Sequence, residues 1–284
     1  MGPFVEAARP RTLPAAIAPV LVGTAAAERF IAWRFAAALV VGLSIQVAVN
    51  YANDYFDGVK GVDTEHRVGP RRAVASGLIS PPRMKAAITV TLVVAAAAGA
   101  ALAWATTPWL LGVGALAFLA ALGYSGGPKP YASIGLGELF VFVFFGLVAT
   151  IGSTFVQDEE VARVAVFAAI PMGLLATAIL VANNIRDIDT DKAAGKATLP
   201  SRLGRDKARS FYRILLLGSF PFVPLIAGVT GSPWSMLPLL SLLLAIPLLN
   251  KVSAEGRDLI PVLIGTARVE MVFGILLAVG LWIS

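Results

Sequence analysis

Long apolar runs recur along almost the whole of this 284-residue chain, and they constrain its fold more than any other feature. A membrane-spanning helix needs roughly 20 consecutive apolar residues, and about nine runs meet that requirement. Such long, evenly apolar runs exclude a barrel of short alternating strands. We therefore predict an all-α integral membrane protein with nine transmembrane helices. They are expected near residues 12–29, 35–57, 86–105, 108–126, 134–156, 161–184, 210–229, 233–250 and 262–283.

The composition agrees with a membrane protein and limits the available chemistry. Charged residues make up only 14% of the chain, against about 25% in soluble domains. Cysteine is absent, so any metal ion must be held by oxygen atoms or by the single histidine, His66. The net charge of +6 could suggest nucleic acid in a soluble protein. Here it is better explained by orientation in a lipid bilayer, and we expect no nucleic-acid partner.

Lysine and arginine predict which side of the membrane each loop occupies. Most of them lie in the N-terminal segment and in the loops near 58–85, 127–133, 185–209 and 251–261, which the positive-inside rule assigns to the cytoplasm. Tryptophans fall at the opposite ends of the spans, where interfacial aromatic residues belong: Trp33, Trp104, Trp109, Trp234 and Trp282. We expect residues 1–284 to form a single multi-pass domain of the cell (inner) membrane, with the N-terminus in the cytoplasm and the C-terminus outside.

An acidic cluster ends the second predicted span, in the stretch "NYANDYFDGVKGVD" from Asn50 to Asp63. A helix would place Asn50, Asn53, Asp54 and Asp57 on one face, because they are spaced i, i+3, i+4 and i+7. For this cluster alone, an ordinary solvated helix end is an equally good explanation.

A second cluster ends the sixth predicted span, in "NNIRDIDTDKAAGKATLPSRLGR" from Asn183 onward. On a continuous helix Asn183, Asp187 and Asp191 would again share one face, while Asp189 would point away. Both clusters lie at the cytoplasmic end of a span, and a basic loop follows each of them. The repetition favours a shared site over two unrelated helix ends.

Facing carboxylates repel each other unless a cation lies between them. Hard oxygen ligands favour Mg²⁺, which typically combines few carboxylates with phosphate oxygens of a substrate. Nearby lysines and arginines would neutralise the remaining phosphate charge. Beside an apolar helix bundle, the natural ligand is a lipid diphosphate with its head at the interface and its tail among the helices.

At these residues the chain resembles the UbiA superfamily of membrane aromatic prenyltransferases. That superfamily has nine transmembrane helices and carries N-D-x-x-D and D-x-x-x-D motifs, which match residues 53–57 and 187–191 here. The stretch "YSGGPKPYASIGLGE", residues 124–138, points to the branch that acts on 1,4-dihydroxy-2-naphthoate. The 4-hydroxybenzoate branch usually has another aspartate four residues after Asp57, where this chain has Gly61; the role of Asp63 stays open.

The resemblance implies transfer of a polyprenyl group from polyprenyl diphosphate to 1,4-dihydroxy-2-naphthoate, with loss of CO₂ and diphosphate, in menaquinone biosynthesis. It also implies roles for the clustered residues. Mg²⁺ would be held by the catalytic residues Asp54, Asp57, Asp187 and Asp191, oriented by Asn50, Asn53 and Asn184. The diphosphate would be assisted by Arg67, Arg72, Lys192 and Lys196.

Six further residues are candidates outside the two motifs. Tyr124 could stabilise an allylic cation through its ring, and Lys129 could bind the acceptor's carboxylate; an interfacial position explains both equally well. Glu138 and Glu270 lie in or beside apolar spans, where charge is costly, and Glu138 is favoured because it closes the branch-specific stretch. Arg9 and Arg11 either anchor the first span or contact substrate.

Two other functions compete with the prenyltransferase hypothesis. A secondary transporter would usually place its site near the membrane midplane on broken helices, whereas these carboxylates lie at span ends. An enzyme of the CDP-alcohol type would carry its aspartates in one continuous motif, whereas this chain divides them between distant spans. Acceptors other than dihydroxynaphthoate, such as 4-hydroxybenzoate, also stay open.

Overall fold

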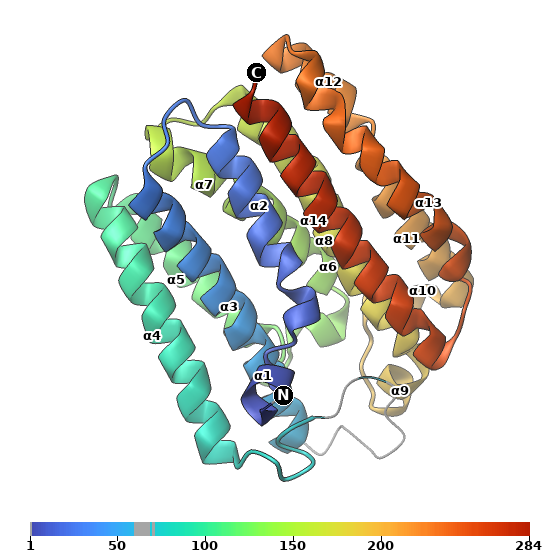
Figure 1. Ribbon diagram of the computed structural model, residues 1–284. Helices are drawn as coiled ribbons and strands as arrows, with labels where there is room; N and C mark the ends of the chain where they lie inside the picture. Colours follow the sequence, from blue (N-terminus) through green and yellow to red (C-terminus); the bar gives the residue numbers. More distant parts are fainter. Residues whose placement is uncertain (1, 60–68, 70–71) are drawn as a thin grey trace.

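The computed structural model describes residues 2–59, 69 and 72–284, which form a bundle of helices running side by side (Figure 1). The α-helices are α1 (Pro3–Ala7), α2 (Pro14–Ala25), α3 (Ala32–Val59), α4 (Pro81–Ala105), α5 (Trp109–Gly123), α6 (Gly137–Val141), α7 (Ala149–Asp158), α8 (Arg163–Arg186), α9 (Ile188–Ala193), α10 (Leu199–Leu203), α11 (Arg205–Gly218), α12 (Phe222–Thr230), α13 (Leu242–Lys251) and α14 (Ile260–Trp282). Short 3-10 helices lie at Pro10–Thr12, Tyr131–Ile134, Pro233–Ser241 and Gly256–Leu259, and a π-helix lies at Phe142–Val148.

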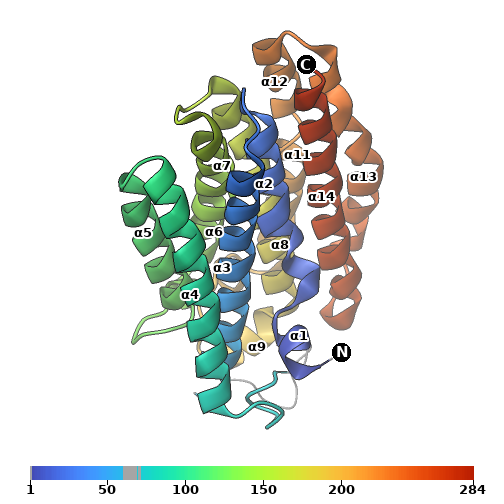
Figure 2. The ribbon, with the colours of Figure 1, turned by 60° about the vertical axis from the view of Figure 1, so that its left-hand side comes forward.

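The predicted all-α membrane fold is confirmed. Within the described residues, seven helical stretches are long and apolar enough to cross a membrane: Ala32–Val59, Pro81–Ala105, Gly137–Asp158, Arg163–Arg186, Arg205–Thr230, Pro233–Lys251 and Gly256–Trp282. The shorter apolar helices α2 and α5 occupy the places of the other two predicted spans. The chain ends lie at opposite ends of the bundle (Figures 1 and 2). We call these the N-terminal end and the C-terminal end of the bundle.

The core of the bundle is built around α8. In its most apolar stretch 67% of the residues are buried, more than in any other span of the described chain. Small residues let neighbouring helices approach it closely, as is usual in membrane bundles. A Cβ atom on Gly146 would lie only 2.4 Å from the Cα of Gly173 in α8, so this crossing requires glycine.

The span from α6 to α7 is interrupted by the π-helix Phe142–Val148. Residues of this span that line a common chamber recur every four positions, as Phe140, Phe144, Val148, Gly152 and Val156 do. In an α-helix, side chains four positions apart differ in direction by about 40° around the helix axis, so such a row would gradually turn away from the chamber. The wider π-turn has more residues per turn and compensates for this rotation, so one face of the span stays directed at the chamber.

Candidate active site

A polar cavity of about 360 Å³ lies at the N-terminal end of the bundle and brings the two acidic clusters together. Its polar and charged lining side chains include those of Asn53, Asp57, Tyr124, Ser125, Lys129, Asn183, Asn184, Asp187, Asp191, Lys196 and Thr198. Clusters that are more than 100 residues apart in sequence therefore share one site, as the sequence predicted.

Asp57 is the first of the carboxylates in this cavity and is held by two cations. Its Oδ2 accepts a hydrogen bond of 2.8 Å from Arg72 Nη2, and its Oδ1 accepts one of 2.9 Å from Lys196 Nζ. Arg72 is buried, with 7% of its side chain exposed. Burial strengthens such pairs, because water screens them less. Two of the four basic side chains that the resemblance assigned to a diphosphate thus lie directly beside a proposed metal ligand.

The second cluster does not lie on one continuous helix, and here the prediction was wrong. Helix α8 ends at Arg186, and α9 begins at Ile188. Asp187, between them, has φ −96° and ψ 7°, outside the α-helical range. The Arg186 guanidinium binds both Asp187 oxygens, at 2.7 and 2.6 Å, and also donates to Asn183 Oδ1 at 2.9 Å. The break still leaves Asp187 and Asp191 on the wall of the same cavity.

Asp191 is a carboxylate of the polar cavity whose pKa is raised. Burial raises the pKa of Asp191 to about 6, and the neighbouring Asp187 carboxylate adds to the rise. Lys196 and a 3.1 Å hydrogen bond from Thr198 Oγ1 oppose it. A bound cation would favour the charged carboxylate. Asp189 points away, as predicted; its side chain is 78% exposed and pairs with Arg205.

Asp54 lines neither the polar cavity nor the apolar chamber that adjoins it. The helical spacing of Asn50, Asn53, Asp54 and Asp57 had suggested that all four face the site. Asp54 Oδ2 accepts a 2.9 Å hydrogen bond from the backbone N–H of Ala73, and its Oδ1 accepts one of 2.8 Å from that of Val74. The carboxylate is buried and fixes the segment that carries Arg72. Each oxygen retains a further lone pair, so metal binding by Asp54 stays a prediction.

The asparagines divide between the cavity and its surroundings. Asn53 lines the cavity and accepts a short hydrogen bond from Ser125. Asn184 lines it as well and donates at 3.0 Å to Glu138 Oε1. Glu138 is buried and lines neither cavity, so its effect on the site passes through Asn184. Asn50 instead donates to Ala8 O at 2.9 Å.

Three other predicted residues have different outcomes. Lys129 lies exposed at the polar cavity. Lys192 is exposed and lines neither cavity, because it follows Asp191 on the outward face of α9. Arg67 lies outside the described residues, as do Asp63 and His66.

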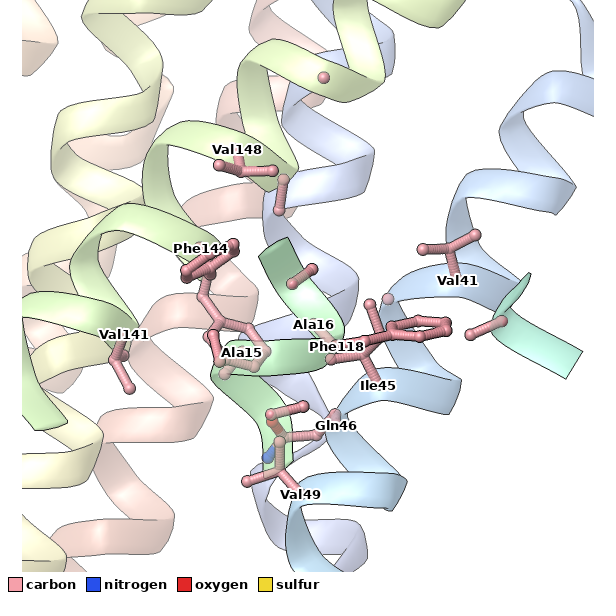
Figure 3. A pocket seen from close by; sticks show the side chains of 18 of the residues that line it. Ala15, Ala16, Val41, Ile45, Gln46, Val49, Phe118, Val141, Phe144 and Val148 are labelled. Carbon is pink, nitrogen blue, oxygen red and sulfur yellow. The ribbon is translucent and has the colours of Figure 1, made fainter. Parts of the chain in front are cut away.

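An apolar chamber of about 510 Å³ adjoins the polar cavity, and the two share Asn53, Tyr124 and Asn183. Ile45 from α3, Phe118 from α5 and Phe144 from the π-helix point into it (Figure 3). Along α3 the chamber is lined from Asn53 back to Ala38, a rise of about 22 Å at 1.5 Å per residue. This length covers most of a bilayer's hydrocarbon core.

A row of aromatic rings lines the chamber, beginning at its junction with the polar cavity. Tyr124 meets Tyr131 edge to face at a centroid distance of 5.5 Å. Tyr131 stacks on Phe140 at 4.0 Å, and Phe140 is followed by Phe144 at 6.2 Å. Burial raises the pKa of Tyr124 and of Tyr131, so both phenols stay protonated and neutral beside the site.

Some site residues were missed by the sequence reasoning. Arg186 stands inside the motif between Asn183 and Asp187, where its charge three residues after Asn183 could have been noticed. Thr198 and Ser125 carry no comparable sequence signal. Glu270, which the sequence also offered as a candidate in an apolar span, is fully buried in α14 and lines neither cavity.

The model of the UbiA prenyltransferase family matches residues 16–257 of this chain. The chain belongs to the UbiA prenyltransferase family. A protein of Mycobacterium tuberculosis (strain ATCC 25618 / H37Rv) named 1,4-dihydroxy-2-naphthoate octaprenyltransferase is 43% identical over 97% of this chain and 95% of its own length. A protein of the same name from Escherichia coli (strain K12) is 36% identical over 99% of this chain and 95% of its own length.

Solved structures of UbiA homologues share the fold. The apo structure of a UbiA homologue from Aeropyrum pernix K1 has a TM-score of 0.70 at 16% identity, covering 96% of each chain. A UbiA homologue from Archaeoglobus fulgidus bound to GPP and Mg²⁺ has a TM-score of 0.63 at 16% identity, covering 96% of this chain and 99% of that one. The confirmed fold is therefore that of UbiA enzymes, embedded in the membrane by several spans.

The oxygen atoms of this UbiA site suit a hard divalent cation that also binds its substrate. Within the described ranges, no group of three or more histidine, aspartate or glutamate side chains is arranged to hold a metal ion by itself. Asp57, Asp187 and Asp191 nevertheless line one cavity together with amide oxygens. Mg²⁺ commonly uses one or two carboxylates and completes its shell with water and phosphate oxygens. The donor set fits Mg²⁺ that arrives with a diphosphate.

Proposed function

We propose that this UbiA protein transfers a polyprenyl group from polyprenyl diphosphate to 1,4-dihydroxy-2-naphthoate, releasing CO₂ and diphosphate and forming demethylmenaquinol. The observation that carries the proposal is the joining of a polar, carboxylate-lined cavity to a long apolar chamber. A diphosphate head suits the first and a prenyl tail suits the second. Near full-length relatives named 1,4-dihydroxy-2-naphthoate octaprenyltransferase support the choice of acceptor.

The donor's diphosphate would bind in the polar cavity. Asp57, Asp187 and Asp191 would hold Mg²⁺, with Asn53 and Asn184 orienting the head group. Bound Mg²⁺ would supply positive charge to the diphosphate oxygens and make them a better leaving group. Arg72 and Lys196 already lie beside Asp57, so they can turn part of their charge toward the incoming phosphates.

Bond breaking would be assisted by these fixed charges. As the allylic C–O bond breaks, its electron pair moves to the diphosphate and negative charge grows on the bridging oxygen. Preorganised cations stabilise such a transition state more than the ground state. Lys129, exposed at the same cavity, would add charge at its mouth.

The allylic fragment must then be protected from water, which would convert it to an alcohol. The chamber wall is apolar and aromatic next to the junction, where Tyr124 and Tyr131 lie. Their ring faces can stabilise a cation without reacting with it. The acceptor's electron-rich ring carbon forms the new C–C bond. Where that carbon bears the carboxylate, heterolysis of the C–CO₂ bond returns an electron pair to the ring.

The test is a reaction of the purified full chain with a polyprenyl diphosphate and dihydroxynaphthoate, with and without Mg²⁺. We expect Mg²⁺-dependent release of diphosphate and a decarboxylated, prenylated product in equal amounts. Diphosphate release with 4-hydroxybenzoate but not with dihydroxynaphthoate would show that 4-hydroxybenzoate is the acceptor. Transport of a lipid diphosphate without turnover would reject the enzyme hypothesis, and turnover of CDP-diacylglycerol would assign the site to another reaction.

A further inference from the structure

The chamber has a polar edge near the polar cavity, formed by Arg9, Thr12, Gln46 and Asn50. Every other part of its described lining is uncharged, so Arg9 supplies the single formal charge on this wall. An arginine beside aromatic rings in an apolar chamber is suited to an anionic aromatic ligand, because the guanidinium can bind a carboxylate with two parallel hydrogen bonds.

The backbone of Arg9 is unusual. Its φ of 51° and ψ of 69° lie in the left-handed region, which only one other non-glycine residue of the described chain enters with positive φ. A residue with a Cβ atom adopts this conformation at an energetic cost. Such conformations persist where the surroundings impose them, and they are common at functional sites.

Side chains of α3 hold this turn on both sides of Arg9. Asn50 Nδ2 donates to Ala8 O at 2.9 Å, on the residue before it. Thr12 Oγ1 donates to Arg9 O at 3.0 Å and accepts from Gln46 Nε2 at 3.0 Å. The hydrogen bonds of Asn50, which the resemblance assigned to orienting the metal ligands, and of Gln46 therefore fix the backbone that carries the guanidinium.

Arg9 also lies close enough to the aromatic row to affect it. Burial and the Glu138 carboxylate raise the pKa of Tyr124, while the positive charge of Arg9 lowers it. Tyr124 belongs to both cavities. A ligand held by Arg9 would therefore place its ring beside the junction at which an allylic cation would form.

We propose that Arg9 binds the carboxylate of the aromatic acceptor at this polar edge, with the acceptor's ring against the aromatic row. The inference rests on the proposed function and assigns to Arg9 the acceptor contact expected of Lys129. Lys129 lines the polar cavity and not the chamber, so its charge is placed for the diphosphate. Arg9 is a binding group here: it positions the acceptor, while the electron-poor prenylated ring drives loss of CO₂.

The test compares dihydroxynaphthoate with 1,4-dihydroxynaphthalene, which lacks the carboxylate. Prenylation of the second acceptor forms the same C–C bond and releases a ring proton in place of CO₂. We expect Arg9→Gln to raise KM for dihydroxynaphthoate at least tenfold. KM for the carboxylate-free acceptor and for the polyprenyl diphosphate should change less than twofold. Arg9→Lys, which keeps the charge but loses the planar fork, should raise KM for dihydroxynaphthoate by less than Arg9→Gln does.

Arg11→Gln is the matched control, because Arg11 is exposed on the same turn and lines neither cavity; it should leave all three KM values unchanged. Equal losses with both acceptors, or a raised KM for the diphosphate, would overturn the inference. So would an unchanged KM for dihydroxynaphthoate. If Arg9→Gln fails to fold, Arg9→Lys replaces it in the test. A KM that rises for dihydroxynaphthoate but not for the carboxylate-free acceptor supports the inference, and equal changes for the two acceptors overturn it. Wild-type turnover of dihydroxynaphthoate upholds the proposed function whichever result the variants give, and its absence rejects both.

Discussion

Lys196 Nζ lies 2.9 Å from Asp57 Oδ1, although 139 residues separate the two along the chain. Asp57 belongs to the acidic cluster at the end of α3, and Lys196 to the basic loop after α9. Their contact joins the two halves of the polar cavity. The Lys196 side chain is 22% exposed, so a diphosphate entering the cavity can reach it and compete with Asp57 for its charge.

The first prediction concerns Asp57 itself. Asp57→Asn removes the formal charge that faces Arg72 and Lys196. It also removes a carboxylate that we propose binds Mg²⁺. We expect kcat/KM to fall by roughly a hundredfold or more, the size of effect seen when a preorganised electrostatic group is lost. Steady-state kinetics at several Mg²⁺ concentrations measure it. Asp189→Asn is the control, because Asp189 is 78% exposed; equal losses in both variants would contradict the role of Asp57.

The second prediction concerns Asp54, which binds the backbone N–H groups of Ala73 and Val74. Asp54→Asn leaves one acceptor oxygen and turns an amide toward the other N–H. Hydrogen bonds to a charged group contribute about 1.5–3 kcal/mol. We expect faster hydrogen exchange at residues 73–79 as well as lost turnover. Unchanged exchange in that segment, with turnover lost, would instead support direct metal binding by Asp54.

A third prediction uses the length of the apolar chamber. Ala38 lines it 15 residues along α3 from Asn53, in a buried apolar cluster with Val156 against which Leu110 packs. Ala38→Phe would fill that end while leaving the head group's surroundings intact. We expect KM for a long polyprenyl diphosphate to rise at least fivefold and KM for geranyl diphosphate to stay within twofold of wild type. Equal changes for both donors would show that the tail does not extend to Ala38.

The fourth prediction concerns the crossing of the α6–α7 span with α8. Gly146→Ala places a Cβ atom 2.4 Å from the Cα of Gly173, so the helices must separate. Overpacking of this kind costs about 1–3 kcal/mol, and we expect a lower melting temperature in detergent. The matched control is Gly112→Ala, since a Cβ there meets nothing within 4 Å. Melting of Gly112→Ala at or above the wild-type temperature is expected, and a loss as large as that of Gly146→Ala would contradict the packing argument.

The fifth prediction tests orientation, which follows from the distribution of lysine and arginine. The chain lacks cysteine, so a single engineered thiol reports one position. Trp109→Cys, at a side chain 84% exposed, should react with an impermeant maleimide added to intact cells. Lys207→Cys should react only after the membrane is opened. The reverse labelling pattern would show that the chain has the opposite orientation in the membrane.

The spans could be predicted from sequence because hydrophobic length in a membrane chain leaves few alternatives. The run at 35–57 corresponds to α3 (Ala32–Val59), and the one at 161–184 to α8 (Arg163–Arg186). The pairing of the two acidic clusters could likewise be predicted, since each cluster lies at the predicted cytoplasmic end of its span. These features depend on local composition and spacing, which the sequence contains directly.

Features that depend on tertiary contacts could not be predicted. The break at Asp187 coincides with its pairing to Arg186, and a helical spacing rule gives no sign of it. The two backbone hydrogen bonds of Asp54 require a loop to fold back onto α3. The left-handed turn at Arg9 is held by α3 side chains distant in sequence. In each case the partner decides the role, and spacing alone does not identify the partner.

The central claim is that the carboxylate-lined cavity and the apolar chamber together prenylate dihydroxynaphthoate. The most direct measurement incubates the purified chain with one polyprenyl diphosphate, Mg²⁺ and one of three acceptors: dihydroxynaphthoate, 4-hydroxybenzoate or homogentisate. We expect demethylmenaquinol, with one CO₂ and one diphosphate for each product, from dihydroxynaphthoate alone. Product from either of the other acceptors in preference to dihydroxynaphthoate, or no product from any of them, would contradict the account.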